Sequence, residues 1–341
     1  MKPLASRIPT APPIIAPPPS SSKRPLWSVM IPTYNCTPYL AEAINSVLMQ
    51  DMGEENMQIE VVDDASTDAD VAQLVATLGK GRIRYFRQVA NVGSLRNFET
   101  CLNRSQGQWV HLLHGDDRVA PGFYTEIATL FHQYPEAGAA FTNTANLQMH
   151  ATGVEVKDRP PIVPKAGLLP DLLLRLAEGQ QLETPSMVVK RSVYEQLGGF
   201  FAVHYGEDWI MWARIAAHFP VAYSPKCLAH YRYLNNTSIT HHSIREGQNV
   251  RDITKVLTII NQYLPVEHRK RLKAIGLRNY AYYCLSLSEG LSATDKRAAI
   301  KQLRGALKMS QHSGIILWSL KIYLKTLLNF KRLKLDPSNS Q

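Results

Sequence analysis

Alternation of short apolar segments with helical ones constrains the fold of this chain more than any other feature of its sequence. The run Ser28–Tyr34 predicts a buried strand, and Thr37 followed by Pro38 marks the start of an amphipathic helix. A second strand at Gln58–Val62 and a helix over Val71–Leu78 repeat the pattern. The alternation continues with a strand at Arg82–Phe86, a helix at Ser94–Arg104 and a strand at Gln108–Leu113. It predicts an α/β fold with a mostly parallel sheet and helices on both of its faces.

The rest of the 341 residues divide into a less regular middle and a helical C-terminal part. In the middle we expect strands at Ala139–Thr142 and Ser186–Lys190, a loop over about 151–165 and a helix at Glu207–Ala217. Helical periodicity follows at Val250–Leu264, Arg269–Leu287, Thr294–Met309 and Ile315–Leu335. We therefore expect three parts: a disordered, proline-rich tail over residues 1–25, an α/β domain over 26–245 and a helical region over 246–341.

Charge and composition narrow the classes of protein to consider. The formal net charge of +10 favours anionic ligands without choosing among them. The four cysteines are widely spaced and form no CxxC pair, so we expect reduced, mostly buried thiols. We find no signal peptide and no run of 18 apolar residues, and we predict no transmembrane helix. The charge keeps a nucleic-acid-binding protein open as an alternative, but no RRM, KH, zinc-finger or helix-turn-helix signature supports it.

Two acidic turns follow predicted strands directly. In parallel sheets ligands bind beyond the carboxyl ends of the strands, so both turns point to a site there. Asp63 and Asp64 could accept hydrogen bonds from a base and a ribose, or could cap the next helix as an Asx turn. Asp116 and Asp117 suit a hard divalent cation such as Mg²⁺ or Mn²⁺, which prefers oxygen ligands, or they form a solvated loop.

Two further groups could carry chemistry. Glu207 and Asp208 open a predicted helix, where a carboxylate could act as a general base or could only cap the helix. Arg96 and Arg232 could bind diphosphate oxygens, although among 38 Lys and Arg residues a single arginine is more often on the surface. No Ser-His-Asp arrangement, GxSxG elbow, P-loop or GxGxxG is present, which argues against hydrolases, P-loop NTPases and dinucleotide enzymes.

Taken in order, these segments resemble the large glycosyltransferase family 2, whose members have a GT-A fold. The resemblance covers about residues 27–240. The matching segments are SVMIPTYN (28–35), IEVVDDASTD (59–68), NVGSLRN (91–97), GQWVHLLHGDD (107–117), LGGF (197–200), EDWIMWARIA (207–216) and YRYLNNTS (231–238). It implies an enzyme that moves a sugar from a nucleotide-diphosphate donor, with a UDP-sugar the commonest donor in the family.

The resemblance also assigns roles on the donor side of the site. The residues that it implies around the nucleotide are Pro32, Tyr34, Asp63 and Asp64 at the base, with Arg96 and Asp116 near the pyrophosphate. Asp116 and Asp117 take the place of the family's metal-binding acidic motif. Arg232, with Thr237 and Ser238, resembles the late segment that closes over the diphosphate.

On the acceptor side the resemblance makes Asp208 the catalytic base, with Glu207 beside it orienting the acceptor. Trp209 and Trp212 are expected near the acceptor cleft. With the metal as Lewis acid and Asp208 as base, a single displacement would invert the anomeric carbon. The implied acceptor is a hydroxyl of a glycan or glycolipid in surface polysaccharide biosynthesis, and the implied location is cytoplasmic.

Two departures from the family's pattern leave alternatives open. His114 stands where the acidic motif often has its first Asp, so Asp116 is expected to carry the metal almost alone. Leu234 stands where many relatives have a histidine, and His241 could substitute for it. A catalytically degenerate fold that only binds a sugar nucleotide or glycan is therefore an alternative, as is a hydrolase of sugar nucleotides.

The last predicted helix carries an apolar stripe. Its members are Leu317, Leu320, Leu324, Leu327 and Leu328, and lysines lie elsewhere on the helix. Such a helix could lie in the interface of an anionic membrane, at the inner face of the cell membrane. It could equally be an ordinary helix that packs on the rest of the protein.

Overall fold

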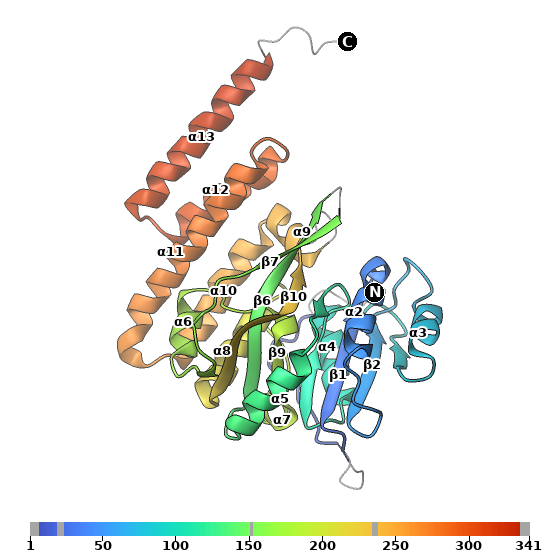
Figure 1. Cartoon of the computed structure of the whole chain (residues 1–341). Helices are drawn as coiled ribbons and strands as arrows, with labels where there is room; N and C mark the ends of the chain where they lie inside the picture. The colour runs from blue at the N-terminus through green and yellow to red at the C-terminus, as the bar shows by residue number, and fades with distance from the viewer. Residues whose placement is uncertain (1–6, 19–23, 151–152, 234–237, 335–341) are drawn as a thin grey trace, which may run out of the picture. The chain divides into compact units, whose positions relative to one another are not determined.

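A computed structural model of the chain describes residues 7–18, 24–150, 153–233 and 238–334 (Figure 1). These residues form two compact units. The first comprises the chain up to Leu173 together with Gln181–Tyr233, and the second comprises Leu174–Gln180 and the chain from Leu234 onward. The helical unit therefore takes in residues ahead of the boundary at 245/246 that the sequence predicts. The two units are described separately.

The described residues of the first unit build one sheet of ten strands. The strand order is β3-β2-β1-β4-β9-β6-β10-β5, with β7 beside β6 and β8 beside β10. The parallel half consists of β1 (Trp27–Thr33), β2 (Met57–Asp63), β3 (Arg84–Arg87) and β4 (Trp109–Leu112). The mixed half consists of β5 (Arg118–Val119), β6 (Ala139–His150), β7 (Gly153–Asp158), β8 (Gly167–Leu168), β9 (Met187–Lys190) and β10 (Val221–Arg232).

The strand β9 is the point at which the direction of the sheet changes. It runs antiparallel to β4 on one side and to β6 on the other. The strand β10 then pairs with β6 in parallel. The start of β9 therefore lies at the same edge of the sheet as the carboxyl ends of β1, β2, β4 and β10.

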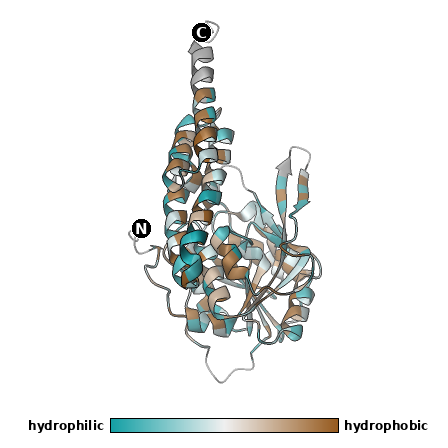
Figure 2. Cartoon of the chain, turned by 90° about the vertical axis from the view of Figure 1, so that its left-hand side faces the viewer, coloured by the Kyte–Doolittle hydropathy of each residue, from teal (hydrophilic) through white to brown (hydrophobic). Residues whose placement is uncertain are grey.

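Helices cover the sheet because the apolar side chains of successive strand residues face opposite sides. The helices of this unit are α2 (Thr37–Leu48), α3 (Val71–Gly79), α4 (Ser94–Arg104), α5 (Phe123–Gln133), α7 (Arg191–Leu197) and α8 (Glu207–His218). The 3₁₀ turn η1 (Thr184–Ser186) also belongs to this unit, whereas most of the short α6 (Leu172–Glu178) belongs to the second one. Alternate residues of β1, such as Val29 and Ile31, pack in one buried cluster with α2, α3 and α5. Figure 2 shows hydrophobic and hydrophilic residues side by side along the helices.

The predicted α/β alternation is confirmed, and the predicted loop at 151–165 is wrong in part. Residues Gly153–Asp158 form β7, which pairs with the extended end of β6. All six residues of β7 are exposed. Val154 and Val156 alternate with Glu155 and Lys157, a short period-two pattern that indicates a strand and that the polar, proline-bearing stretch around it outweighed in the prediction.

The expectation of a disordered tail is wrong for residues 7–18. The side chain of Ile15 is buried, and the carbonyls of Pro9 and Pro13 accept hydrogen bonds from the backbone N–H groups of Ala202 and Gly199. Proline fixes an extended backbone whose carbonyls stay available as acceptors, which suits a segment that lies along other loops. Residues 1–6 and 19–23 of the predicted tail lie outside the described residues.

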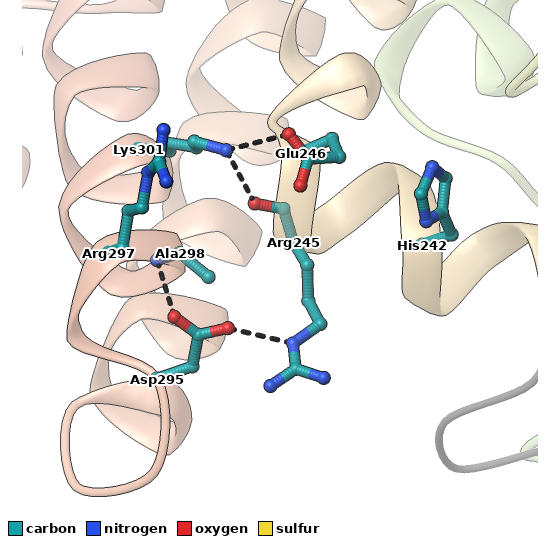
Figure 3. Close-up of a pocket in the computed structure, with 7 residues that line it drawn as sticks. All are labelled: His242, Arg245, Glu246, Asp295, Arg297, Ala298 and Lys301. Atoms are coloured by element: carbon teal, nitrogen blue, oxygen red, sulfur yellow. Dashed lines mark hydrogen bonds and ion pairs between the residues drawn. The ribbon is translucent and has the colours of Figure 1, made fainter.

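The second unit is helical. It contains α9 (Ile239–Glu246), α10 (Gln248–Tyr263), α11 (Val266–Leu291), α12 (Lys296–Met309) and α13 (Ser313–Lys334). The ion pairs Arg245–Asp295 and Lys301–Glu246 join α9 to the start of α12 around a polar hollow of about 310 Å³ (Figure 3). No helix in the described part of the chain is long and apolar enough to cross a membrane.

Candidate active site

The site is built at the edge where β1, β2, β4 and β10 end and β9 begins. Backbone hydrogen bonds continue the ladder between β1 and β4 past the ends of both strands. The N–H of Leu113 donates to the carbonyl of Met30, and the N–H of Gly115 donates to the carbonyl of Pro32. A Cβ on Gly115 would lie 2.8 Å from the Thr33 hydroxyl and from the Cys36 sulfur, so only glycine fits there. This close approach fixes the acidic turn after β4 against the end of β1.

The acidic turn contains a cluster that fits a metal ion. Ligand atoms of His114, Asp116 and Asp117 lie within 4.8 Å of one another. Asp117 is 1% exposed, and its Oδ2 has no hydrogen-bond partner among the described residues; nor has Nε2 of His114. A buried carboxylate oxygen without a partner is costly unless a cation satisfies it. The cluster therefore adds His114 to the two predicted aspartates, whereas the sequence led us to expect Asp116 almost alone.

Electrostatics supports the same interpretation. Burial, followed by the nearby charge of Asp116, raises the pKa of Asp117 well above its usual value. Burial lowers the pKa of His114, which keeps its imidazole neutral and able to donate a lone pair. A divalent cation would relieve the repulsion between the two carboxylates and would be held by oxygen and nitrogen ligands together.

Arg232 supports the acidic turn through hydrogen bonds to Asp116 and Asp117. Its backbone N–H donates to Oδ1 of Asp117 at 2.8 Å, and its Nε donates to the carbonyl of Asp116 at 2.8 Å. The guanidinium also pairs with Glu42 and lies over the Tyr39 ring, and the side chain is fully buried. This arrangement supports the turn and differs from the predicted position, in which Arg232 faces the diphosphate.

The two aspartates after β2 anchor loops. Asp63 is fully buried and accepts hydrogen bonds from the Tyr85 hydroxyl and from the backbone N–H of Ser66, both at 2.8 Å. Asp64 accepts from the backbone N–H groups of Val92 and Gly93 at 2.7 and 2.9 Å. Asp63 is thus engaged inside the protein, while Asp64 ties the loop before α4 to the edge of the sheet.

Of the other residues predicted at the nucleotide, Tyr34 is the most accessible. Its side chain is 49% exposed, in the turn that follows the buried Pro32. Asn35 links this turn to the one after β2, because its Oδ1 accepts from the backbone N–H of Thr67 at 2.8 Å. Arg96 lies in the first turn of α4 and pairs with Glu99 at 2.6 Å. The structure therefore brings an aromatic side chain and a guanidinium to the same edge as the acidic turn.

Asp208 begins α8 at this edge of the sheet. Its Oδ1 accepts from the backbone N–H of Trp209 at 2.7 Å, and the Thr184 hydroxyl lies 3.4 Å from Oδ2. Burial, followed by the charge of Glu183, raises the pKa of Asp208 to about 7. A carboxylate with a pKa near neutrality is suited to accept a proton from a hydroxyl.

Glu183 and Thr184 are the site residues that sequence reasoning missed. Glu183 acts electrostatically on both Asp208 and Asp117, and it pairs with Arg159 at 2.9 Å. The only signal for them is their position directly before the strand at 187–190. In an all-parallel sheet that position would lie at the opposite edge, and the antiparallel direction of β9 brings it to the site.

The prediction that Trp209 and Trp212 line the acceptor cleft is wrong for this structure. The two side chains are 2% and 1% exposed. Trp212 packs edge-on against Phe200, with ring centroids 6.1 Å apart. Both side chains lie on the buried side of α8 and contribute to the core, because burial stabilises a large apolar ring. Glu207 is half-buried in the first turn of α8, beside Asp208.

Beyond Tyr233 the late segment is described only from Ser238 onward. Leu234 and Thr237 lie outside the described residues. Ser238 caps α9 by accepting a hydrogen bond from the backbone N–H of His241. His241 itself belongs to the helical unit.

Comparison with known sequences identifies proteins that this chain resembles. A family model described as glycosyl transferase family 2 matches residues 28–167. An uncharacterized glycosyltransferase of Haemophilus influenzae is 23% identical over 238 residues, which are 68% of this chain and 72% of the relative. A minor teichoic acid biosynthesis protein of Bacillus subtilis, GgaB, is 32% identical over 111 residues, which are 32% of this chain and 12% of the relative.

Solved structures share the fold. The crystal structure of S. aureus TarS 1–349 in complex with UDP-GlcNAc superposes with a TM-score of 0.65 at 15% identity, covering 90% of this chain and 91% of that one. The mannosyltransferase PcManGT from Pyrobaculum calidifontis, in complex with GDP-Man and Mn²⁺, gives a TM-score of 0.56 at 18% identity, covering 92% and 90%. With its strand order, its acidic turn after β4 and the family match, the chain carries a glycosyltransferase family 2 domain over residues 28–167 and is a glycosyltransferase with the GT-A fold.

Proposed function

We propose that this glycosyltransferase moves a sugar from a nucleotide-diphosphate donor, a UDP-sugar, to a hydroxyl of a glycan or glycolipid and inverts the anomeric carbon. One observation carries the proposal. The metal-fitting turn at His114, Asp116 and Asp117 and the high-pKa carboxyl of Asp208 are both under the electrostatic influence of Glu183, at one edge of the sheet. A cation site for a diphosphate and a base for a hydroxyl are the two groups that a single displacement requires.

Asp208 acts as the general base in this mechanism. Its carboxylate takes the proton of the acceptor hydroxyl while the oxygen forms the new bond to the anomeric carbon. The bond from that carbon to the diphosphate breaks on the opposite face, and the diphosphate leaves with the electron pair. A divalent cation held by Asp116, Asp117 and His114 would supply positive charge for the leaving diphosphate. Burial and the charge of Glu183 raise the pKa of Asp208 to about 7, which makes the carboxylate a stronger base for the hydroxyl proton and still allows it to release that proton to water near neutral pH.

The donor is held by residues that the structure leaves accessible. Tyr34 offers an exposed ring for a base, and Arg96 offers a guanidinium at the start of α4, where helix geometry also favours a phosphate. We assign Arg232 a positioning role, because its buried guanidinium holds the backbone of the acidic turn. The donor complexes of TarS and PcManGT support a nucleotide-sugar donor for this chain.

The proposed acceptor class follows from the relatives and from the C-terminal helix. The name of the teichoic acid biosynthesis relative and the family resemblance favour surface polysaccharide biosynthesis. Contact with the surface of a membrane fits α13, which buries Ile315 and Ile322 in the helical unit and exposes a second apolar stripe. The exposed members described there are Ile316, Leu317, Leu320, Tyr323 and Leu324. The side chains of Leu327 and Leu328, which the sequence adds to the stripe, lie outside the described residues.

A nucleotide panel tests the proposed chemistry. We expect UDP with Mn²⁺ to raise the melting temperature of the wild-type protein more than GDP, TDP or CMP do, because ligands that bind only the folded state stabilise it. Asp116→Ala should remove the metal-dependent part of the shift. Asp208→Asn should keep the shift and lose transfer to acceptor. No shift with any nucleotide would reject the proposal and favour a degenerate fold, and sugar release without acceptor would indicate a hydrolase.

Flotation with liposomes tests the membrane contact. Leu317, Leu320 and Leu324 are replaced by serine together in the full chain, which leaves the buried face of α13 intact. We expect the wild-type protein to float with vesicles that contain anionic lipid and the triple variant to stay at the bottom. Replacement of the exposed Ile300 on α12 by serine is the matched control. Equal flotation of all three proteins, or none, would reject the contact.

A further inference from the structure

The segment 7–18, named here the N-terminal strap, spans from the donor side of the site to the loop that leads into α8. At its C-terminal end the backbone N–H of Ala16 donates to Asn103, near the end of α4, and Arg191 donates to the carbonyl of Ala16. In its middle, Pro9 and Pro13 accept from the loop at 199–202. Its first described residue, Arg7, lies at the opposite end of α4, beside the loop at 91–93.

The side chain of Arg7 packs against that loop. Its guanidinium donates to Oδ1 of Asn91. A Cβ on Gly93 would lie 2.8 Å from Nε of Arg7, and Gly93 has a φ of +94°, so a side chain there would both clash and be strained. The same loop is bonded to Asp64 through Asn91, Val92 and Gly93. Arg7 acts electrostatically on the Asp64 carboxyl, whose pKa is raised mainly by burial.

Arg7 places a positive charge near the start of α4, with Asn91 and Asp64 as its neighbours. Gly93 precedes the first turn of α4, where the helix dipole presents partial positive charge. The helix dipole repels a cation at this end of the helix, and the charge of Asp64 offsets that repulsion. Asp64 also accepts three hydrogen bonds from the loop. A guanidinium has five N–H donors, and the contact with Asn91 uses one of them.

Arg7 and Asp64 together present a donor beside an acceptor. Oδ2 of Asp64 receives two hydrogen bonds and Oδ1 receives one, so Oδ1 keeps capacity for one more. A donor next to an acceptor complements the O=C–N–H unit of a nucleobase edge. Uracil, thymine and guanine carry this unit, whereas cytosine and adenine do not.

We propose that Arg7 of the N-terminal strap is a specificity-determining residue of the donor site, which donates to the carbonyl of a uracil, thymine or guanine base while Asp64 accepts from the neighbouring ring N–H. This inference rests on the proposed function, because it requires a nucleotide donor at this edge. The strap thereby makes a residue from before the first strand part of the base pocket.

Calorimetric titration of Arg7→Gln and Arg7→Lys tests the inference. The probes are the nucleoside, the monophosphate and the diphosphate of the base that stabilises the wild-type protein. We expect Arg7→Gln to weaken all three by the same factor of about ten, because a charge-assisted hydrogen bond to the base is lost from each. Arg7→Lys should restore part of the loss. The kcat at saturating donor should stay unchanged while the donor KM rises.

The control variant is Arg271→Gln, which removes the same charge from an exposed position on α11. A chain that lacks residues 1–8 should behave like Arg7→Gln, since it keeps Pro9, Pro13 and Ile15 in place. Unchanged binding by Arg7→Gln, or weakening of the diphosphate alone, would overturn the inference and leave the proposed function standing. Binding of CDP or ADP in preference to UDP, TDP and GDP would overturn it too. A wild-type protein that binds none of them would instead refute the proposed function together with the inference.

Discussion

Replacing Asp208 with asparagine should abolish activity and stabilise the protein at the same time. The asparagine keeps the shape of the side chain and an oxygen that accepts from the N–H of Trp209. It removes a carboxyl whose pKa rises from an ordinary 3.8 to about 7 in the folded protein. Because the folded-state pKa is the higher one, this carboxyl favours folding fully below about pH 4, and that contribution is lost as the pH rises through about 7.

The size of the effect follows from the shift. A difference of this size corresponds to at most about 4 kcal/mol when Asp208 is fully ionised. The side chain is partly exposed, so solvent reduces the cost, and we expect about 2 kcal/mol. At about pH 5 the carboxyl is mostly ionised in the unfolded chain and mostly protonated in the folded protein, so the full shift would cost at most about 1.7 kcal/mol, and about 1 kcal/mol should remain after the same reduction.

Urea unfolding of the wild-type protein and Asp208→Asn, at about pH 5 and about pH 8 in the presence of a chelator, measures this difference. We expect the variant to be more stable by about 2 kcal/mol at the higher pH and by about 1 kcal/mol at the lower one. Glu54→Gln, which changes an exposed carboxyl in the same way, is the matched control. A variant that gains no stability between the two pH values would refute the argument that burial and Glu183 raise this pKa, and a variant that still transfers sugar would refute Asp208 as the base.

Three further predictions concern the site and the sheet. In a thermal-shift assay, Mn²⁺ should raise the melting temperature of the wild-type protein. Asp117→Asn should raise the melting temperature without metal and abolish the response to metal, because the substitution removes a buried carboxylate whose Oδ2 has no hydrogen-bond partner among the described residues. Glu183→Gln should shift the acidic limb of the profile of kcat/KM against pH to lower pH, since the charge that raises the pKa of Asp208 is lost; an unmoved limb would contradict the role of Glu183. Gly107→Ala should destabilise the protein by about 3 kcal/mol or more in urea unfolding, because its Cβ would lie 2.4 Å from the carbonyl carbon of Trp27, and wild-type stability in this variant would disprove the close approach.

The sequence determined the features that depend on neighbours along the chain. Strands such as 58–62 and helices such as 94–104 follow from local periodicity and capping, and the structure confirms both near the predicted bounds. The acidic turns could be found because the carboxyl ends of parallel strands meet at one edge whatever the details of packing. Asp116 and Asp117 could therefore be predicted from the sequence, and Asp208 was predicted from the resemblance to the family.

Tertiary structure alone decided which side chains share the site and which are buried. Glu183 reaches Asp208 only because β9 runs against its neighbours, and strand direction depends on pairing between distant segments. Trp209 and Trp212 leave the acceptor side because burial of a large ring outweighs exposure at the start of α8. Arg7 reaches Gly93 through a strap whose prolines suggested a disordered tail. Local sequence encodes periods and turns, whereas burial and strand direction are set by contacts between residues far apart in the chain, which no window along the sequence contains.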